Sequence, residues 1–208
     1  MRRRDVVGLL LAGMFAAPCA HAGDVVEALD PIAELNKGLL EVMRAGADTP
    51  FPARFGMLAP KIDRAFDLPG ILRACVGPRW SALSPKEQSG LSDVFRQFTV
   101  ASYVASFDHY AGERFELTPD SRPSPGGEIV ETHIISAGAA PVRIDYVMRQ
   151  QGDSWRAVDV LFNGTISRVA VQRADFRSLL EDAPDASALI ASLQRKVSDL
   201  SGGTLAPG

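Results

Sequence analysis

The chain has 208 residues, with 22 basic and 25 acidic side chains and a formal net charge of −3. This length is enough for one well-formed hydrophobic core. The weak negative charge and the absence of a concentrated basic patch argue against a nucleic-acid-binding function.

The first 22 residues have the organisation of a secretory signal peptide. Three arginines at positions 2–4 precede an apolar run at 6–17, and Ala20-His21-Ala22 is a small-x-small cleavage motif. The run is shorter than the roughly 20 residues that a spanning helix needs. We therefore expect cleavage before Gly23 and a soluble periplasmic protein. The sequence does not decide between the possible export pathways. Losing three arginines and Asp5 changes the net charge from −3 to −5.

The next segment predicts one long helix followed by a loop. Apolar residues recur with helical spacing over 25–45. Residues 48–60 contain three prolines and a glycine, and they are predicted to form a loop or a chain of turns. Two short helices are expected after it, at 61–65 and at 68–76, the second with Asp67 as its N-cap.

A strong helix start follows at Ser84-Pro85-Lys86-Glu87. Ser84 is placed as the N-cap, Pro85 as the first helical residue and Glu87 as the partner in a capping box. The helix is predicted to run to about Tyr110. Its apolar residues cover more than one face, so we expect it to be buried on two sides.

From residue 113 onward the pattern is typical of an antiparallel sheet. Four strand-like runs, at 113–118, 128–136, 142–150 and 155–162, are separated by turns or by the Pro-, Ser- and Gly-rich segment 119–127. In the third run, alternation places four apolar side chains on one face and charged side chains on the other. The apolar set is Val142, Ile144, Tyr146 and Met148.

Two closing helices, at 166–180 and 186–200, complete a single domain over 23–200, and 201–208 are expected to be a disordered tail. The prediction is therefore an α+β fold, with helices over 25–110, a sheet over 113–162 and closing helices over 166–200. A sheet with one apolar face must be covered by helices. Where it curves around them, unfilled space becomes a pocket.

Chemistry-bearing residues form no recognisable catalytic or metal motif in the sequence. After the signal peptide only His109 and His133 remain, on different elements, and neither has a zinc-ligand spacing. We expect no cofactor and no metal.

Cys75 is the one cysteine of the mature chain and is expected to be a buried apolar residue. Asp145 and Asp159 are interpreted as a solvated salt-bridge face, with Arg143, Arg156 or Arg168 as partners.

Two blocks of sequence resemble the MlaC/toluene-tolerance family of periplasmic phospholipid-binding proteins. The first is FDLPGILR at 66–73, continued by VGPRWSALSP at 76–85. The second comprises Trp155, Arg156, Asp159, Val160, Gly164, Ser167, Arg173 and Phe176. Within that family, the segments at 107–115 and 163–176 are most similar to the HpnM branch, which is associated with hopanoids.

The resemblance implies an NTF2-like fold, in which a curved antiparallel sheet of about four strands packs with a helical subdomain around an apolar pocket. It also implies a monomeric carrier that holds a phospholipid or a hopanoid and contacts inner- and outer-membrane transport complexes transiently. Such a carrier needs no catalytic residue. From the predicted inward faces we expect the pocket wall to include Val104, Phe107, Ile134, Ile144, Tyr146, Met148, Val158, Val160 and Val169.

Two other functions are compatible with the sequence. One is a lipid-free adaptor of an inner-membrane transport complex, for which an exposed apolar patch without a cavity would be evidence. The other is an isomerase- or dehydratase-type enzyme with an NTF2-like pocket, built from Asp145, Asp159, Tyr146 and His133. That enzyme would need a carboxylate with a raised pKa beside an acid partner deep in the pocket.

Overall fold

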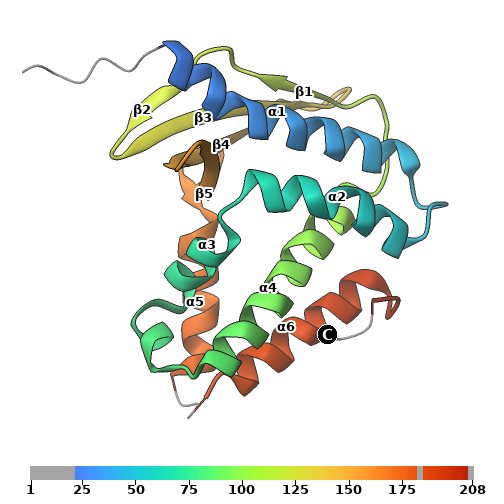
Figure 1. Cartoon of the computed structure of the whole chain (residues 1–208). Helices are drawn as coiled ribbons and strands as arrows, with labels where there is room; N and C mark the ends of the chain where they lie inside the picture. Colours follow the sequence, from blue (N-terminus) through green and yellow to red (C-terminus); the bar gives the residue numbers. More distant parts are fainter. Residues whose placement is uncertain (1–21, 182–184, 206–208) are drawn as a thin grey trace, which may run out of the picture.

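The computed structural model describes residues 22–181 and 185–205, so the predicted signal peptide lies outside the described residues except for Ala22. Helices α1 and α2 lie along the sheet, and α3 to α6 form a helical subdomain beside it (Figure 1), an α+β arrangement as predicted. The elements are α1 (Ala22–Ala45), α2 (Phe51–Ala65), α3 (Leu68–Val76), η1 (Gly77–Ala82), α4 (Pro85–Ser106), β1 (Arg114–Leu117), β2 (Arg122–Ser124), β3 (Gly127–Ile135), β4 (Val142–Gln151), β5 (Ser154–Phe162), β6 (Ile166–Ser167), α5 (Arg168–Leu180) and α6 (Ser187–Ser201).

Helix α2 occupies most of the segment that was predicted as a loop from its prolines, and that prediction is wrong. Pro52 lies in the first turn, where a missing N–H is harmless because first-turn donors have no helical partner. Pro60 lies inside the helix and removes one helical hydrogen bond. Leu58 and Ile62 are both 0% exposed, so burial of this face outweighs the loss. The expected short helix at 61–65 is the last turn of α2.

The predicted caps of α3 and α4 are confirmed. The Asp67 carboxylate accepts a hydrogen bond from the Gly70 N–H at 3.0 Å. The Glu87 carboxylate accepts one from the Ser84 N–H at 2.8 Å, while the Ser84 hydroxyl accepts one from the Glu87 N–H, which completes the capping box. Helix α4 ends at Ser106 rather than near Tyr110, because Phe107 leaves the helical conformation.

The sheet has six strands instead of about four. Its order is β1-β3-β4-β5-β6, with β2 also paired to β3, and all of these pairs are antiparallel. The two unexpected strands are short: β2 lies in the predicted loop at 119–127, and β6 takes the first two residues of the predicted helix at 166–180. Both pair with the strand next to them in the chain through a short turn, β2 with β3 across residues 125–126 and β6 with β5 across residues 163–165.

A β-bulge changes which side chains of β5 face the helices. Tyr146 pairs with Val160, but Met148 pairs with Ala157, so Val158 has no partner across the ladder. A bulge inserts one extra residue and shifts the alternation of side chains beyond it. The buried residues of β5 are therefore Trp155 and Ala157 before the bulge.

The closing helices begin close to their predicted positions. Ser167 caps α5, its hydroxyl accepting a hydrogen bond from the Ala170 N–H at 2.9 Å. Helix α6 ends with Gly202 in the left-handed conformation. Thr204 donates from its hydroxyl to the Ser201 carbonyl at 2.6 Å, in a segment where the sequence predicts a disordered tail. Residues 206–208 lie outside the described residues.

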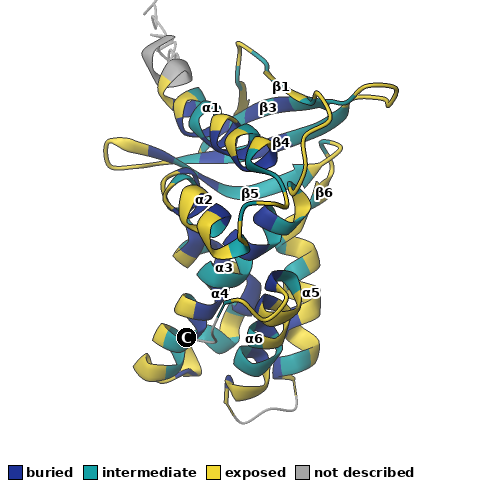
Figure 2. Ribbon diagram, turned by 90° about the vertical axis from the view of Figure 1, so that its right-hand side faces the viewer, coloured by how far each residue is buried: buried dark blue, intermediate teal, exposed yellow. Residues whose placement is uncertain are grey.

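One face of the sheet and the helices share the hydrophobic core. Figure 2 shows buried residues where the helices meet the sheet and again inside the helical subdomain. Asn36 of α1 donates to the Thr132 hydroxyl of β3 at 3.4 Å, which places α1 on the same face as Thr132. This arrangement leaves the C-terminal end of α4 opposite the remaining part of that face.

Candidate functional site

A large cavity lies between the apolar face of the sheet and the C-terminal end of α4. Its volume is about 500 Å³, within the range of ligand-binding pockets. Seven elements contribute to its wall, which is mostly aliphatic and aromatic. The lining residues are Ser102, Tyr103, Ser106, Phe107, Phe115, Thr132, Ile134, Ile144, Tyr146, Val160, Phe162, Ile166 and Arg168.

A smaller compartment of about 90 Å³ adjoins the large cavity, between α3, α4 and α5. Its own wall includes Phe95, Phe98 and Val169. Both compartments share four lining residues, Ser102, Tyr103, Val160 and Arg168. The two spaces therefore meet at this group, and we refer to these four residues as the junction.

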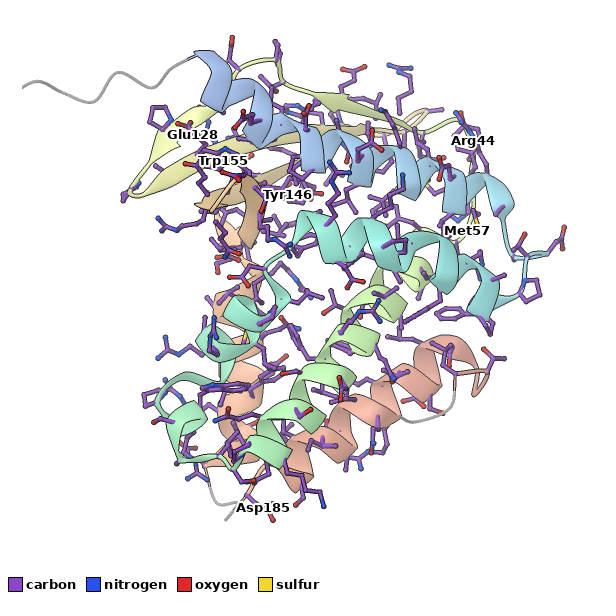
Figure 3. All side chains as sticks on the ribbon, in the orientation of Figure 1. Arg44, Met57, Glu128, Tyr146, Trp155 and Asp185 are labelled. Atoms are coloured by element: carbon purple, nitrogen blue, oxygen red, sulfur yellow. The ribbon has the colours of Figure 1, made fainter. Side chains whose placement is uncertain are left out.

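A row of aromatic rings crosses the interior along the two compartments. Phe66, between α2 and α3, has its ring centroid 5.7 Å from that of Tyr103 and 6.2 Å from that of Tyr146. Phe107 stacks on Tyr103 at 6.2 Å and contacts Phe115 at 5.8 Å. Figure 3 shows Tyr146 between the sheet and the helices. The row gives the cavity a stiff apolar wall.

Two large apolar side chains are exposed at the edge of the cavity. Phe162 and Ile166 pair across β5 and β6, and they are 42% and 51% exposed. Both also line the large cavity. Exposed apolar residues beside an apolar pocket are typical of a ligand-binding groove or of a contact site for another surface.

The polar residues that line the two compartments include one carboxylate, Asp159, and two phenols, Tyr103 and Tyr146. The Asp159 carboxylate accepts hydrogen bonds from the N–H groups of Val160 at 2.7 Å and Val169 at 3.1 Å, and from the Ser167 hydroxyl at 2.5 Å. These contacts fix the start of α5. Burial raises the pKa of both Tyr103 and Tyr146, so both phenols stay protonated at neutral pH.

The opposite face of the sheet carries an ion-pair cluster, and Asp145 is not solvated as predicted. Asp145 is 0% exposed, and its carboxylate accepts hydrogen bonds from Arg143 Nε at 2.8 Å and Nη2 at 2.7 Å, and from Arg122. Glu131 also contacts Arg143, at 2.7 Å. The guanidinium groups of the two arginines shield the Asp145 carboxylate from solvent. Alternation along a single strand does not predict this burial, because Arg122 comes from another strand. Asp159 pairs with backbone amides and Ser167 instead of an arginine.

The structure places the nine predicted wall residues in three different surroundings. Five of them line the large cavity: Phe107, Ile134, Ile144, Tyr146 and Val160. Val169 lines the smaller compartment.

Val104, Met148 and Val158 line neither compartment. Val104 and Met148 are both 0% exposed and belong to the filled core. Val158 is half-buried and lies at the β5 bulge. There the alternation of side chains no longer predicts which face of the sheet a residue occupies.

Several lining residues were missed by the sequence reasoning. Ser102, Tyr103 and Ser106 lie three or four residues from one another or from Phe107, and helical spacing could have grouped them with it. Thr132 shares the inward face with Ile134, but it is polar and was therefore left out. No sequence pattern indicated Arg168.

The four groups considered for an enzyme are divided between the two faces of the sheet. Tyr146 lines the large cavity and Asp159 lines the smaller compartment. Asp145 is held by arginines on the opposite face, where His133 lies 3.5 Å from Glu131. Among the described residues, no cluster of three or more His, Cys, Asp or Glu side chains is placed to hold a metal ion.

Within 22–181 and 185–205, no helix is long and apolar enough to cross a membrane.

Comparison with known proteins adds a family and a fold. A sequence model of the family described as "MlaC protein" matches residues 33–195. Among solved structures, the chain is similar to the phospholipid-binding protein from Ralstonia solanacearum in complex with a phospholipid. The TM-score is 0.72 at 17% sequence identity, over 84% of this chain and 99% of that one, which establishes a shared fold. No curated protein matches the chain.

Proposed function

The chain belongs to the MlaC protein family, and we propose that it is a carrier that holds a lipid in the large cavity and does no chemistry on it. The observation that carries this proposal is the apolar cavity of about 500 Å³, with Phe162 and Ile166 exposed at its edge. The phospholipid described in the similar Ralstonia solanacearum protein supports the same interpretation.

The physical need for such a carrier is large. Each CH₂ group moved from an apolar environment into water costs about 0.8 kcal/mol, so a 16-carbon chain resists crossing water by about 13 kcal/mol. A polycyclic hopanoid meets a barrier of similar size. A protein that offers an apolar wall removes most of this barrier without any reacting group.

The finer parts of the proposal rest on the sequence. The N-terminal motif supports a periplasmic protein whose signal peptide is cleaved. The antiparallel sheet with a cavity against one of its faces supports the NTF2-like interpretation. Similarity to the HpnM branch keeps a hopanoid beside a phospholipid as the cargo. We infer that the protein is a monomer that shuttles this cargo between inner- and outer-membrane complexes.

The test is native mass spectrometry of the mature protein purified without detergent, with extraction and identification of bound lipid. We expect one lipid bound per protein. The variant Ile144→Asp places a charge on the cavity wall and should abolish lipid retention. Ser106→Trp, which fills the cavity from an exposed position on α4, should do the same without burying a charge.

Val147→Asp is the matched control, because Val147 is half-buried on the same strand and faces away from the cavity. It should retain lipid. Retention of lipid by both cavity variants would contradict the proposed site. A wild-type protein that carries no lipid and takes up none would instead favour the lipid-free adaptor.

A further inference from the structure

A further pocket, of about 310 Å³, lies outside the two compartments, between the turn from α3 to η1 and the C-terminal half of α5. We call it the arginine pocket, because Arg79, Arg173 and Arg177 all line it. Among the described residues that line it, Glu181 carries the one negative charge, so three positive charges and one negative charge give a net of +2. The whole chain has a net charge of −3, so this pocket has the opposite sign to the protein that carries it.

Two of these arginines have no counter-ion in the described structure. Arg173 and Arg177 are exposed, and within 22–181 and 185–205 neither guanidinium makes a hydrogen bond or an ion pair. They are four residues apart and therefore share one face of α5, where like charges repel. Glu181 lies four residues further on, but its contact with Arg177 is between backbone atoms, from the Glu181 N–H to the Arg177 carbonyl at 2.9 Å. Such a pair of cations favours the binding of an anion.

The backbone opposite α5 brings a wall of the pocket close to Arg173. Gly77 ends α3 with a φ of 67°, a conformation that other residues rarely adopt. A Cβ built on Gly77 would lie 3.5 Å from Arg173 Nη2, so the guanidinium lies against the turn. The glycine turn and α5 thus form the two sides of a concave site.

The inner part of the arginine pocket is apolar. Cys75, Val76 and Leu180 line it and are buried, whereas Arg173 and Arg177 are exposed at its edge. Burial raises the pKa of the Cys75 thiol to about 12, so this thiol is uncharged at neutral pH. A ligand that matches both parts of the pocket carries acidic groups beside an apolar side chain.

We propose that the arginine pocket binds an acidic segment of a partner protein, whose carboxylates contact Arg173 and Arg177 and whose apolar side chain enters between Val76 and Leu180. This inference goes beyond the proposed carrier function, which requires partners but does not specify their chemistry. A concave pocket with an apolar interior suits an inserted side chain better than a flat membrane surface, and the negative charge of the whole chain opposes approach to an anionic membrane. A free oxyanion would use the arginines and leave the apolar interior empty.

The position of the pocket on α5 relates it to the lipid cavity. Arg168 is the first residue of α5 and lines both compartments, and Arg177 follows nine residues later. At 1.5 Å per residue, these two positions are about 14 Å apart along the helix axis. One partner protein is large enough to contact both, so docking at the arginine pocket would bring it near the cavity from which lipid is exchanged.

The test measures binding of a fluorescein-labelled GEDLEDG peptide to the mature protein by fluorescence anisotropy. Two matched peptides separate the contributions, one with Gln and Asn in place of the acidic residues and one with Ser in place of Leu. We expect the acidic peptide to bind about tenfold more tightly than the neutral one, with an affinity that falls as salt is raised. Loss of the Leu side chain should weaken binding several-fold.

Arg173→Gln and Arg177→Gln should each weaken the acidic peptide about two- to fivefold, and the double variant about tenfold, as expected for exposed ion pairs. Arg195→Gln is the matched control, since Arg195 is an exposed arginine of α6 that lies outside the lining of this pocket. It should leave the affinity unchanged. All these variants should keep the Tm and the lipid occupancy of the wild-type protein, because the altered side chains are exposed.

Equal wild-type affinities for the acidic and neutral peptides, or an affinity that survives the double variant, would overturn the assignment. Arginine-dependent binding to vesicles of phosphatidylglycerol and phosphatidylcholine, without binding of the peptide, would overturn it in favour of a membrane surface. Displacement of the peptide by inorganic phosphate at a similar concentration would overturn the restriction to a protein segment. Absence of lipid from the wild-type protein contradicts the carrier function instead, and it leaves arginine-dependent peptide binding as support for the pocket.

Discussion

Replacing Asp145 by Asn should lower the free energy of unfolding by about 3 kcal/mol and leave lipid retention unchanged. The carboxylate is 0% exposed and accepts two hydrogen bonds from Arg143 and one from Arg122. The amide nitrogen of Asn would face guanidinium donors, so at least one charge-assisted bond is lost, at about 1.5–3 kcal/mol each. Both arginines keep access to water, which places the total near the lower end of the roughly 3–5 kcal/mol for a broken buried pair.

The measurement is urea and thermal unfolding followed by circular dichroism. For a protein of this size each kcal/mol shifts Tm by about 2–4 °C, so Tm should fall by roughly 6–12 °C. Arg114→Gln, which breaks the exposed pair with Glu116 at 3.1 Å, is the control and should cost under about 1 kcal/mol. A fall in Tm of less than about 2 °C in Asp145→Asn would refute the argument that this buried carboxylate depends on its arginines.

Three further changes test the local physics. Ser84→Ala removes the acceptor of the capping box and should cost about 1 kcal/mol in urea unfolding; no change would mean that α4 does not depend on its cap. Gly127→Ala would place a Cβ 2.0 Å from the Met148 carbonyl oxygen, so the backbone must shift at this end of β3 and the free energy of unfolding in urea should fall; an unchanged value would contradict this close approach. Met148→Ala should cost about 2–5 kcal/mol because Met148 is fully buried, whereas Ile144→Ala at the cavity wall should cost less; equal costs would indicate that the cavity is closed in solution.

Local sequence determinants predicted the parts of the fold that depend on neighbouring residues. The Asp67 and Ser84 caps act over three residues, and both lie where the sequence placed them. Alternation along β4 put Ile144 and Tyr146 on the inward face, and both line the cavity. In each case the interaction is short in sequence, so the residue types alone specify it.

Features that depend on distant contacts were not predictable in this way. Helix α2 forms despite Pro60 because Leu58 and Ile62 are fully buried where α2 packs on α1, α4 and β5. The β5 bulge is visible only as a mismatch between two paired strands, and it removed Val158 from the predicted wall. Arg168 faces the cavity because the start of α5 is fixed by Asp159, a contact between two elements that no periodicity encodes.

Anchors outside the cavity explain how it persists in a fold that otherwise packs densely. The segment that connects α2 to α3 is hydrogen-bonded to β5. The Asp67 N–H donates to the Ala157 carbonyl at 3.0 Å, and Arg156 donates to the Asp63 carbonyl at 3.0 Å. Arg96 of α4 pairs with the same Asp63 through two hydrogen bonds of 2.7 and 2.6 Å. These polar contacts hold the sheet and α4 at a set separation, so apolar side chains cannot close the gap by a rigid shift.

It follows that weakening these anchors should affect lipid retention more than stability. Arg96→Gln breaks a half-exposed ion pair, for which a cost of at most about 1 kcal/mol is expected. The freed α4 can then approach the sheet and narrow the cavity from the Tyr103 and Phe107 side. Lipid occupancy by native mass spectrometry should fall while Tm changes by only a few degrees. Full occupancy in this variant would show that the aromatic row, not the polar anchors, keeps the walls apart.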